Sequence, residues 1–580
     1  MKKIYYLILL SLTFSTLGYS QDLIYNEDPV SSGGYDGWKD GRVPGNTAGT
    51  SRNRNIIIEK GHVVFPEKTR CYDLTILEDG SATILPGTWV YLEHEEISEG
   101  VFDTTIGNLV INGNLTITSN STQYGAIYVE GTSTGQLTYD LYVKPGPVSQ
   151  FISSPVQGET FGDLASSNPN IYSPYGTTVK RIGEWDKSTG TYVEWDTAIN
   201  SGKVFTSGVG YFAATSSTNN ILSFTGTNIT EDFNLPVTHT PTTYASQWNL
   251  IGNPFACYIR VRTIVRNNFD KLQPGKSGAY ADNGTYWTVY NELSDFKIPP
   301  GQGFYFAVLE DTTIYFNQGM RSVAGDTGGD DFITGRGDIE EEEEEAVPYI
   351  SLNLSTGTEE KHYTHIYFTD EASLGLDERF DTTIFGSNAS GFTMYTQLAE
   401  SETDSNYKLG IQAIPTTALE NAGTAIPLGI QAPKGQQITI DIKENILDSN
   451  AIVYLEDTKT NTWTALKDKA YTFTTEEQLT GLGRFVVHVT NEARLSIDDS
   501  SILETLQFIS GSNSINIKGL LEKNTKLSVF DMQGRLINST TISNTVNEHQ
   551  INSSNYGSGI YIVKVKTPAG KNIAKRVILK

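Results

Sequence analysis

Short runs of alternating apolar and polar residues recur along almost the whole chain, and each run ends in Gly, Asn, Asp or a Ser-Thr cluster. The runs are rich in Val, Ile, Thr, Tyr and Phe, as in residues 89–92 and 438–442. Successive side chains of a strand point to opposite faces, so an alternating run can bury one face. The 3.6-residue period of a helix is almost absent. The pattern therefore predicts an all-β protein.

The first part of the mature chain, residues 21–145, repeats a strand and turn unit at short intervals. Gly-Asn-Leu-x-Ile occurs at residues 107–111 and again at 113–117, and residues 72–76 are a looser relative. Repetition of this kind is typical of a β-solenoid, in which each coil buries its apolar side chains against its neighbours. We predict a β-solenoid-like region, with a β-sandwich of hairpins as the alternative.

A longer internal repeat covers residues 146–325. Residues 151–155 match 250–254, with an offset of 99 residues. Two further landmarks follow in the same order at offsets of 93 and 92, namely 208–213 with 301–306 and 221–224 with 313–316. The repeat predicts two related β-units of about 95 residues, whose glycines allow tight turns and whose aromatic side chains fill the interface between them.

The composition changes in residues 326–348, where a Gly- and Asp-rich stretch precedes six glutamates, Glu340–Glu345. Like charges repel and glycines resist ordering, so we predict an acidic linker. A calcium site is the alternative, but the acidic residues lack the spacing of an EF-hand loop. Alternating runs resume in residues 349–490 and predict a two-sheet β-sandwich, followed by a second linker at 491–503.

The N-terminus predicts a secretory signal peptide over residues 1–20. Lys2 and Lys3 precede an apolar run, and small residues stand before a cut at Gln21. No later apolar run is long enough for a spanning helix, so we expect no transmembrane helix. The two cysteines, Cys71 and Cys257, are expected to be buried free thiols, although a disulfide between them stays open at this stage.

The charge of the chain argues against nucleic acid as a partner. The 67 Asp and Glu outnumber 42 Lys and Arg, which gives a net charge of −25. Most affinity for a phosphate backbone comes from Lys and Arg that replace counterions. Residues 501–580 differ from the rest, with ten Lys or Arg against four Asp or Glu, so residues 21–500 carry −33.

The C-terminal residues 504–580 resemble a known family. Residues 529–537, 556–565 and 575–580 occur in order and look like the motifs of the type A C-terminal sorting domain of type IX secretion. The residues that carry the resemblance are Gly534, Arg535, Gly559, Ile560, Tyr561, Lys575 and Arg576. It implies an Ig-like β-sandwich, and an ordinary Ig-like binding domain is the alternative.

The resemblance also implies a route and two partners. A Bacteroidetes-type outer-membrane translocon would read the domain after the signal peptide had directed the chain across the inner membrane. A sorting peptidase would then remove the domain, leaving the protein anchored at the surface or secreted. Residues 248–255 with 298–304 are similar to a pairing found in non-catalytic extracellular β regions of such exported proteins.

Few side chains offer catalytic chemistry, and we assign no catalytic residue. His362 and His365 fall in a predicted strand, where residues three apart face opposite sides and do not easily share a metal. Glu93 to Glu96, with His94 among them, form an acidic turn that could support acid-base cleavage of a polysaccharide. We expect no metal and no cofactor.

The repeated region concentrates aromatic residues that could contact a ligand. The cluster contains Tyr175, Trp185, Tyr192, Trp195, Tyr211, Tyr286, Trp287 and Tyr290. We take Trp185, Trp195 and Trp287 as candidate ligand-binding residues, since exposed rings stack on sugar faces or contact a protein surface, with core filling as the alternative. The sequence predicts an exported adhesin or a glycan- or protein-binding scaffold; the alternative is a β-solenoid polysaccharide lyase or hydrolase.

Overall fold

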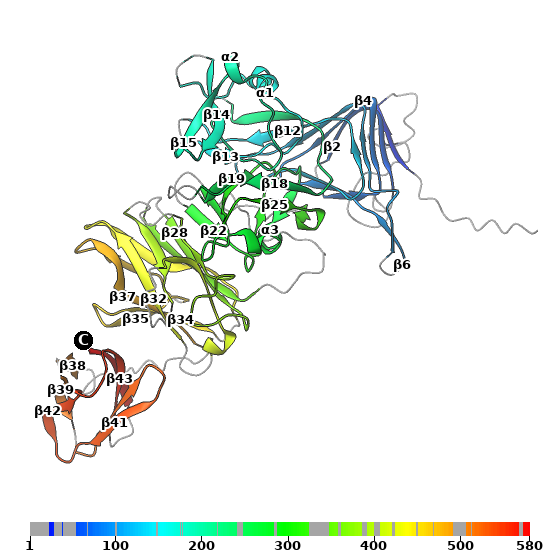
Figure 1. The fold of residues 1–580 in the computed structure, drawn as a ribbon. Helices are drawn as coiled ribbons and strands as arrows, with labels where there is room; N and C mark the ends of the chain where they lie inside the picture. The colour runs from blue at the N-terminus through cyan, green and yellow to red at the C-terminus, as the bar shows by residue number, and fades with distance from the viewer. Residues whose placement is uncertain are drawn as a thin grey trace, which may run out of the picture. The chain divides into compact units, whose positions relative to one another are not determined.

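The structure is a computed structural model of the 580-residue chain, and it divides into two compact units, Met1–Glu492 and Ala493–Lys580 (Figure 1). It describes residues 22–27, 38, 54–65, 68–98, 101–146, 149–174, 176, 178–216, 219–240, 247–282, 287–323, 347–357, 361–385, 391–398, 407–419, 424–447, 451–467, 469–490, 506–511, 513–521, 523–567 and 572–579. The predicted signal peptide, the linker at 491–503 and residues 326–346 of the acidic linker lie outside these ranges.

The N-terminal region consists mainly of parallel strands. Its larger sheet contains β1 (Leu23–Asn26), β2 (Ile56–Phe65), β4 (Leu74–Ile84), β8 (Leu109–Ile111), β9 (Asn114–Thr118), β11 (Ser133–Thr134) and β12 (Leu137–Tyr142). Its smaller sheet contains β3 (Thr69–Cys71), β5 (Trp89–Leu92) and β10 (Ala126–Val129), and β6 (Glu95–Ser98) pairs with β7 (Val101–Asp103). Figure 1 shows the long strands β2 and β4 side by side.

The register of the parallel strands places apolar residues beside apolar residues of the neighbouring strand. Ile56 lies beside Leu74, and Leu74 lies beside Leu109, all fully buried. This stacking buries one apolar row along the sheet, as the alternating pattern requires. Parallel pairing of successive strands is compatible with a β-solenoid. That these strands form the successive coils of a β-solenoid stays a prediction.

The next part contains two four-stranded sheets with the same order of strands. The first runs β13 (Gln150–Ile152), β16 (Tyr211–Ala213), β14 (Val179–Asp186), β15 (Thr191–Asp196). The second runs β19 (Trp248–Gly252), β24 (Gly303–Ala307), β21 (Ala279–Asp282), β22 (Trp287–Tyr290). In both, the first strand along the chain pairs with the last, as two related units would. That the units are related stays a prediction.

Short elements complete these two units. The helices are α1 (Phe161–Ser167), α2 (Thr197–Asn200) and α3 (Val261–Arg266). The remaining strands are β17 (Ile221–Gly226), β18 (Phe233–Val237), β20 (Tyr258–Arg260), β23 (Lys297–Ile298), β25 (Thr312–Phe316) and β26 (Arg321–Ser322). Strand β17 pairs antiparallel with β12, so the repeated region continues the N-terminal sheet.

The strands of residues 349–490 form one continuous path of pairs, and strands from both halves of this path contribute to one apolar core; the two-sheet sandwich stays a prediction. The order is β35 (Thr462–Ala465), β34 (Ile452–Asp457), β37 (Leu479–Thr490), β32 (Thr424–Ala432), β30 (Thr393–Thr396), β31 (Leu409–Ile414), β28 (Lys361–Phe368), β27 (Tyr349–Thr356), β33 (Gln437–Asn445), β36 (Tyr471–Thr474), with β29 (Thr382–Thr383) beside β31. The path is continuous because β30 pairs with both β31 and β32.

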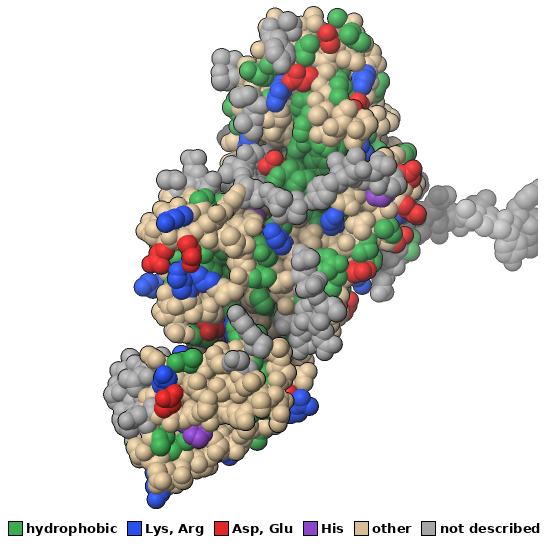
Figure 2. All heavy atoms as spheres, turned by 60° about the vertical axis from the view of Figure 1, so that its left-hand side comes forward, with side chains coloured by type: hydrophobic (Ala, Val, Ile, Leu, Met, Phe, Trp, Pro, Cys, Tyr) green, Lys and Arg blue, Asp and Glu red, His purple; other side chains and the backbone are tan. Residues whose placement is uncertain are grey.

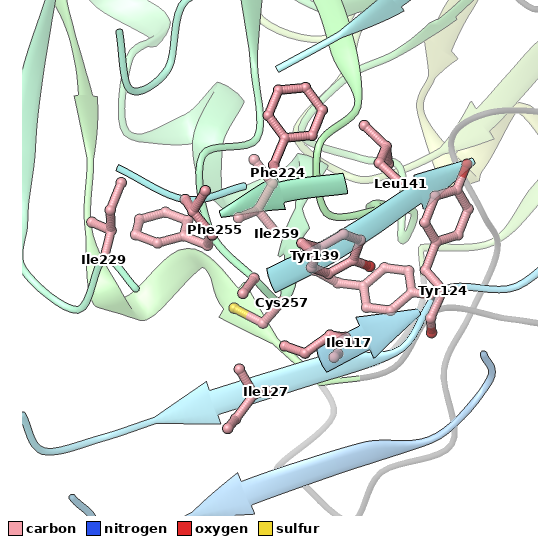
Figure 3. Packing of buried hydrophobic residues seen from close by; sticks show 14 of the residues in the cluster. Ile117, Tyr124, Ile127, Tyr139, Leu141, Phe224, Ile229, Phe255, Cys257 and Ile259 are labelled. Carbon is pink, nitrogen blue, oxygen red and sulfur yellow. The ribbon is translucent and has the colours of Figure 1, made fainter. Parts of the chain in front are cut away.

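One apolar core runs from Leu23 to Val323, so the N-terminal region and the repeated units are not packed separately; a second core joins Phe151 and Trp248 of the repeated units to residues after 349. Figure 3 shows part of this core, where Cys257 lies among Ile117, Ile127 and Tyr139. Both cysteines are buried and free, as expected. Burial raises the pKa of the Cys257 thiol to about 12, so the thiol is protonated.

The C-terminal unit has two antiparallel sheets around its own apolar core. One contains β38 (Gln507–Ser510), β39 (Ser514–Leu521) and β42 (Val546–Asn552). The other runs β41 (Leu536–Thr541), β40 (Lys526–Asp531), β43 (Gly559–Lys566), β44 (Asn572–Leu579). The prediction of an all-β protein is confirmed in both units.

Candidate functional site

Two of the three predicted tryptophans contribute to one aromatic surface. We define this surface by four partly exposed side chains, Trp185, Tyr192, Trp287 and Phe385. Trp185 and Tyr192 face each other across the β14–β15 pair, with ring centroids 4.8 Å apart. Trp287 begins β22 and stacks on Phe385 at 3.8 Å and 12°. The surface therefore combines both repeated units with the region after residue 349.

A buried layer of rings supports the aromatic surface. Phe151 lies 5.8 Å from both Tyr192 and Trp287, and Tyr305 lies 6.2 Å from Trp185. Phe151 is 5% exposed and Tyr305 is 2% exposed. Edge-to-face and offset contacts at these distances hold rings in fixed orientations. The partly exposed rings are thus fixed in place before any ligand arrives.

A hydroxyl pair links the surface to the layer beneath it. The hydroxyl oxygens of Tyr192 and Tyr305 lie 2.8 Å apart. Burial raises the pKa of Tyr192 to about 12 and also raises the pKa of Tyr305. Both phenols are therefore neutral at physiological pH, and the surface has aromatic and hydroxyl character without a phenolate charge.

Trp195 does not belong to this surface, which corrects its assignment as a candidate ligand-binding residue. Its side chain is 1% exposed and packs against Phe161, Phe205 and Tyr211. A ring enclosed in this way has no free face for a ligand, so core filling accounts for Trp195. Tyr211 and Tyr290 are each 1% exposed, and Tyr175 and Tyr286 lie outside the described residues.

Phe385 was missed by the sequence analysis. It lies in the predicted sandwich region, far along the chain from Trp287, and no spacing connects the two positions. Figure 2 shows hydrophobic side chains gathered in the middle of one face, with charged side chains scattered around them. The four members of the aromatic surface come from segments far apart in the sequence, so only folding brings them together.

Two carboxylates near the acidic turn, those of Glu93 and Glu130, have partners within the fold. Arg70 donates to Glu93 at 2.9 Å, and its guanidinium lies 4.7 Å from the Tyr91 ring. Glu130 accepts the Tyr91 hydroxyl and the backbone N–H of His94, both at 2.5 Å. Burial raises the pKa of Tyr91. Paired carboxylates of this kind are typical of a structural network.

The histidine pair on β28 is buried in two different environments. His362 Nε2 lies 3.0 Å from the Thr393 hydroxyl, and burial lowers the pKa of His362 to about 4. His365 lies among aromatic rings, 5.7 Å from that of Tyr290. Within the described ranges, no three or more His, Cys, Asp or Glu side chains are grouped so that they could hold a metal ion.

Folding brings the three motifs of the C-terminal unit to one end of a sheet. Asp531 pairs with Tyr561 on β43, and Tyr561 pairs with Val577 on β44, next to Arg576. Gly534, with φ of +75°, closes the turn in which Arg535 donates to Asp531 at 3.0 Å. The remaining motif residues lie in paired strands, with Gly559 and Ile560 opposite Leu579 and Ile578, and Lys575 opposite Val563.

Comparisons with protein families identify two parts of the chain. Residues 511–580 match the secretion system C-terminal sorting domain. Residues 274–489 match a domain of unknown function (DUF8693), and this match extends across the predicted linker at 326–348. No curated protein matches the chain in sequence. Across the ranges that the structure describes, no helix has the length and apolar character to cross a membrane.

Two solved structures show a distant likeness. One is the adhesin domain of Epf from Streptococcus pyogenes, with 10% identity over 40% of this chain and 92% of that chain, at a TM-score of 0.11. The other is the BSP domain of a biofilm-associated protein, with 8% identity over 77% of this chain and 96% of that chain, at a TM-score of 0.13. At these TM-scores neither likeness supports an argument about this chain.

Proposed function

We propose, from the premise that residues 511–580 are a type IX secretion C-terminal sorting domain, that this chain is a non-catalytic adhesin or binding scaffold of the cell surface. The sorting domain indicates export to the surface or secretion. Its partners would be the type IX translocon and a sorting peptidase, acting after a signal peptide has directed the chain across the inner membrane.

The aromatic surface is the observation that carries the binding role. Trp185 and Trp287 pack against buried rings and stay partly exposed beside Tyr192 and Phe385, so the four side chains form one apolar patch rather than scattered single residues. Rings of this kind stack on the apolar faces of sugars or contact a protein surface at low entropic cost, because they are already ordered. A glycan or a surface protein is therefore the proposed ligand.

The alternative of a polysaccharide lyase or hydrolase has weaker support. Acid-base cleavage needs two carboxyl groups placed on either side of the scissile bond. Glu93 and Glu130, the carboxylates at the acidic turn, are paired with Arg70 and Tyr91, and the side chains of Glu95 and Glu96 lie outside the described set. A reducing-end release assay on the mature protein separates cleavage from binding.

The binding role is tested with a double variant, Trp185→Ala with Trp287→Ala. We expect retention on a glycan array or on cells to fall at least about tenfold, since each stacking contact contributes about 1 kcal/mol. Each substitution alone should lower the melting temperature less than Trp195→Ala does, because the Trp185 and Trp287 rings are only partly buried.

Two further variants control this experiment. Trp463→Ala removes a partly exposed tryptophan from β35, away from the aromatic surface, and should leave retention unchanged. Trp195→Ala empties a buried site and should cost about 3–5 kcal/mol of stability. Unchanged retention of the double variant would refute the role of the aromatic surface.

A further inference from the structure

We infer that the outer face of the larger N-terminal sheet carries a second binding site, a groove for a neutral, hydroxyl-rich glycan. The groove has a volume of about 420 Å³. The side chains on which the inference depends are Asn112, Asn114, Gln136, Thr116, Thr138 and Thr225. The inference rests on the proposed surface-binding function for its biological role, but its chemistry is independent of the aromatic surface.

Three threonines on neighbouring strands form the floor. Thr116 on β9 pairs with Thr138 on β12, which pairs with Thr225 on β17. All three point away from the core, because Leu115, Leu137 and Phe224 next to them are buried. The hydroxyls of Thr138 and Thr225 lie 2.9 Å apart. Adjacent strands are about 4.8 Å apart, so the hydroxyls form a regular polar row.

Three carboxamides stand at the rim. Asn112, Asn114 and Gln136 are exposed, and their side-chain amides make no hydrogen bond to the described part of the chain. Each carboxamide offers both donors and an acceptor, which is the combination that neighbouring sugar hydroxyls require. These groups are therefore available to a ligand, and the threonines beneath them supply further hydroxyl partners.

The turns that hold the carboxamides are fixed by close backbone contacts. A Cβ on Gly113 would lie 2.1 Å from the carbonyl oxygen of Gly80. Gly135 has φ of +87°, and its Cβ would lie 2.0 Å from the carbonyl oxygen of Ile111. Only glycine fits at both places. Gly113 also begins the second Gly-Asn-Leu-x-Ile phrase, so this repeated motif places Asn114 on a rigid turn, and rigid placement lowers the entropic cost of binding.

The chemistry of the lining selects the ligand class. Of the described residues that line the groove, none is charged or aromatic. Sulfate, phosphate or carboxylate groups would find no cation there, in a body of net charge −33. An apolar peptide or lipid would leave the amides unpaired at a cost. A neutral oligosaccharide satisfies the hydroxyls and amides together.

The test uses the mature protein and isothermal titration calorimetry. The probes are cellohexaose, maltohexaose, mannohexaose and xylohexaose, with polygalacturonate and chondroitin sulfate as anionic probes. We expect at least one neutral probe to bind and neither anionic probe to bind in the groove. Asn114→Ala with Gln136→Ala should weaken the neutral probe about tenfold or more, since each lost hydrogen bond changes affinity severalfold.

Matched variants make the outcome specific. Gln437→Ala removes an exposed glutamine from β33 and should leave affinity unchanged. Asn114→Asp keeps the size of the side chain but adds a negative charge, and should also weaken binding. Unchanged melting temperatures for all these variants, which replace exposed side chains, would exclude misfolding as the cause.

The outcomes separate this inference from the proposed function. If the groove variants bind the neutral probe like the parent protein while the Trp185 and Trp287 variants lose it, the groove is refuted and the aromatic surface stands. If only the groove variants lose the probe, the groove stands and the aromatic surface is refuted for that ligand. If no neutral probe binds the parent protein, the groove is an ordinary solvated sheet face and the inference fails.

Discussion

At the scale of single residues, Glu159 is a carboxyl group in an unfavourable place. Its side chain is 5% exposed and accepts a hydrogen bond from the backbone N–H of Thr225 at 2.6 Å. Burial raises the pKa of Glu159 from its ordinary value of 4.5 to about 7, with a smaller contribution from the nearby Asp163. Folding therefore favours the protonated carboxyl, and ionisation opposes the fold.

Glu159→Gln should make stability less dependent on pH. The contribution of Glu159 to the free energy of unfolding is fully present below about pH 4.5. It is lost as the pH rises through about 7, because the pKa of Glu159 is raised in the folded state. Glutamine keeps the acceptor for Thr225 but cannot ionise. We expect the variant to melt about 1 °C or more above the parent protein at pH 8, because in a unit of this size 1 kcal/mol corresponds to about 1 °C.

The matched measurement at pH 5 should show little difference between the two proteins, because the parent carboxyl is then protonated. Thermal melts followed by circular dichroism at both pH values provide the comparison. An equal shift at pH 5 and pH 8 would contradict the role of ionisation at Glu159.

At the scale of elements, the two repeated units meet through the glycine phrases that define the repeat. The backbone N–H of Gly210 donates to the carbonyl oxygen of Leu250, and the N–H of Gly252 donates to the carbonyl oxygen of Gly208. The first unit therefore pairs with strand β19 of the second. The matching phrases also meet in the opposite combination, because the backbone N–H of Ser153 in the first unit donates to the carbonyl oxygen of Gly301 in the second. A Cβ at Gly210 or Gly252 would lie less than 3 Å from the facing unit, and Gly208 and Gly301 have φ of +79° and +69°, which explains glycine at these places.

Gly303→Ala should weaken the contact between the two units. A Cβ at Gly303 would lie 2.9 Å from the backbone nitrogen of Ile152 and equally close to Phe151. The strands would have to separate, so we expect a loss of about 1–3 kcal/mol in unfolding free energy. Gly202→Ala is the control, because a Cβ there meets nothing within 4 Å. Equal urea midpoints for the two variants would contradict this account.

The sequence predicts strands well and their partners poorly, for a physical reason. Alternation is local, so the buried Leu137, Tyr139 and Leu141 of β12 follow directly from their period of two. Pairing depends on distant segments, and nothing in the alternation indicates that Tyr139 lies beside Phe224 of β17. Trp185 and Trp195 differ for the same reason, since neighbouring elements decide which ring is covered.

At the scale of the whole molecule, the negative charge and the sorting signal lie in different parts of the chain. Residues 21–500 carry a net charge of −33, and residues 501–580 carry +6. The sorting domain has its own apolar core and forms a separate compact unit. If a peptidase removes it, the remaining protein is more acidic than the whole, which favours contacts with neutral glycans or with proteins over nucleic acid.

Deletion of residues 504–580 should abolish surface display and leave the rest of the protein folded. Because Met1–Glu492 is compact by itself, its purified form should retain the cooperative melt that its apolar core supports. In the native host, immunofluorescence on intact cells and protease accessibility should detect the full-length protein and not the truncated one. The truncated protein should accumulate in the periplasm. Matching levels in whole-cell blots would show that synthesis is not the cause. Continued display of the truncated protein would mean that export does not depend on this domain.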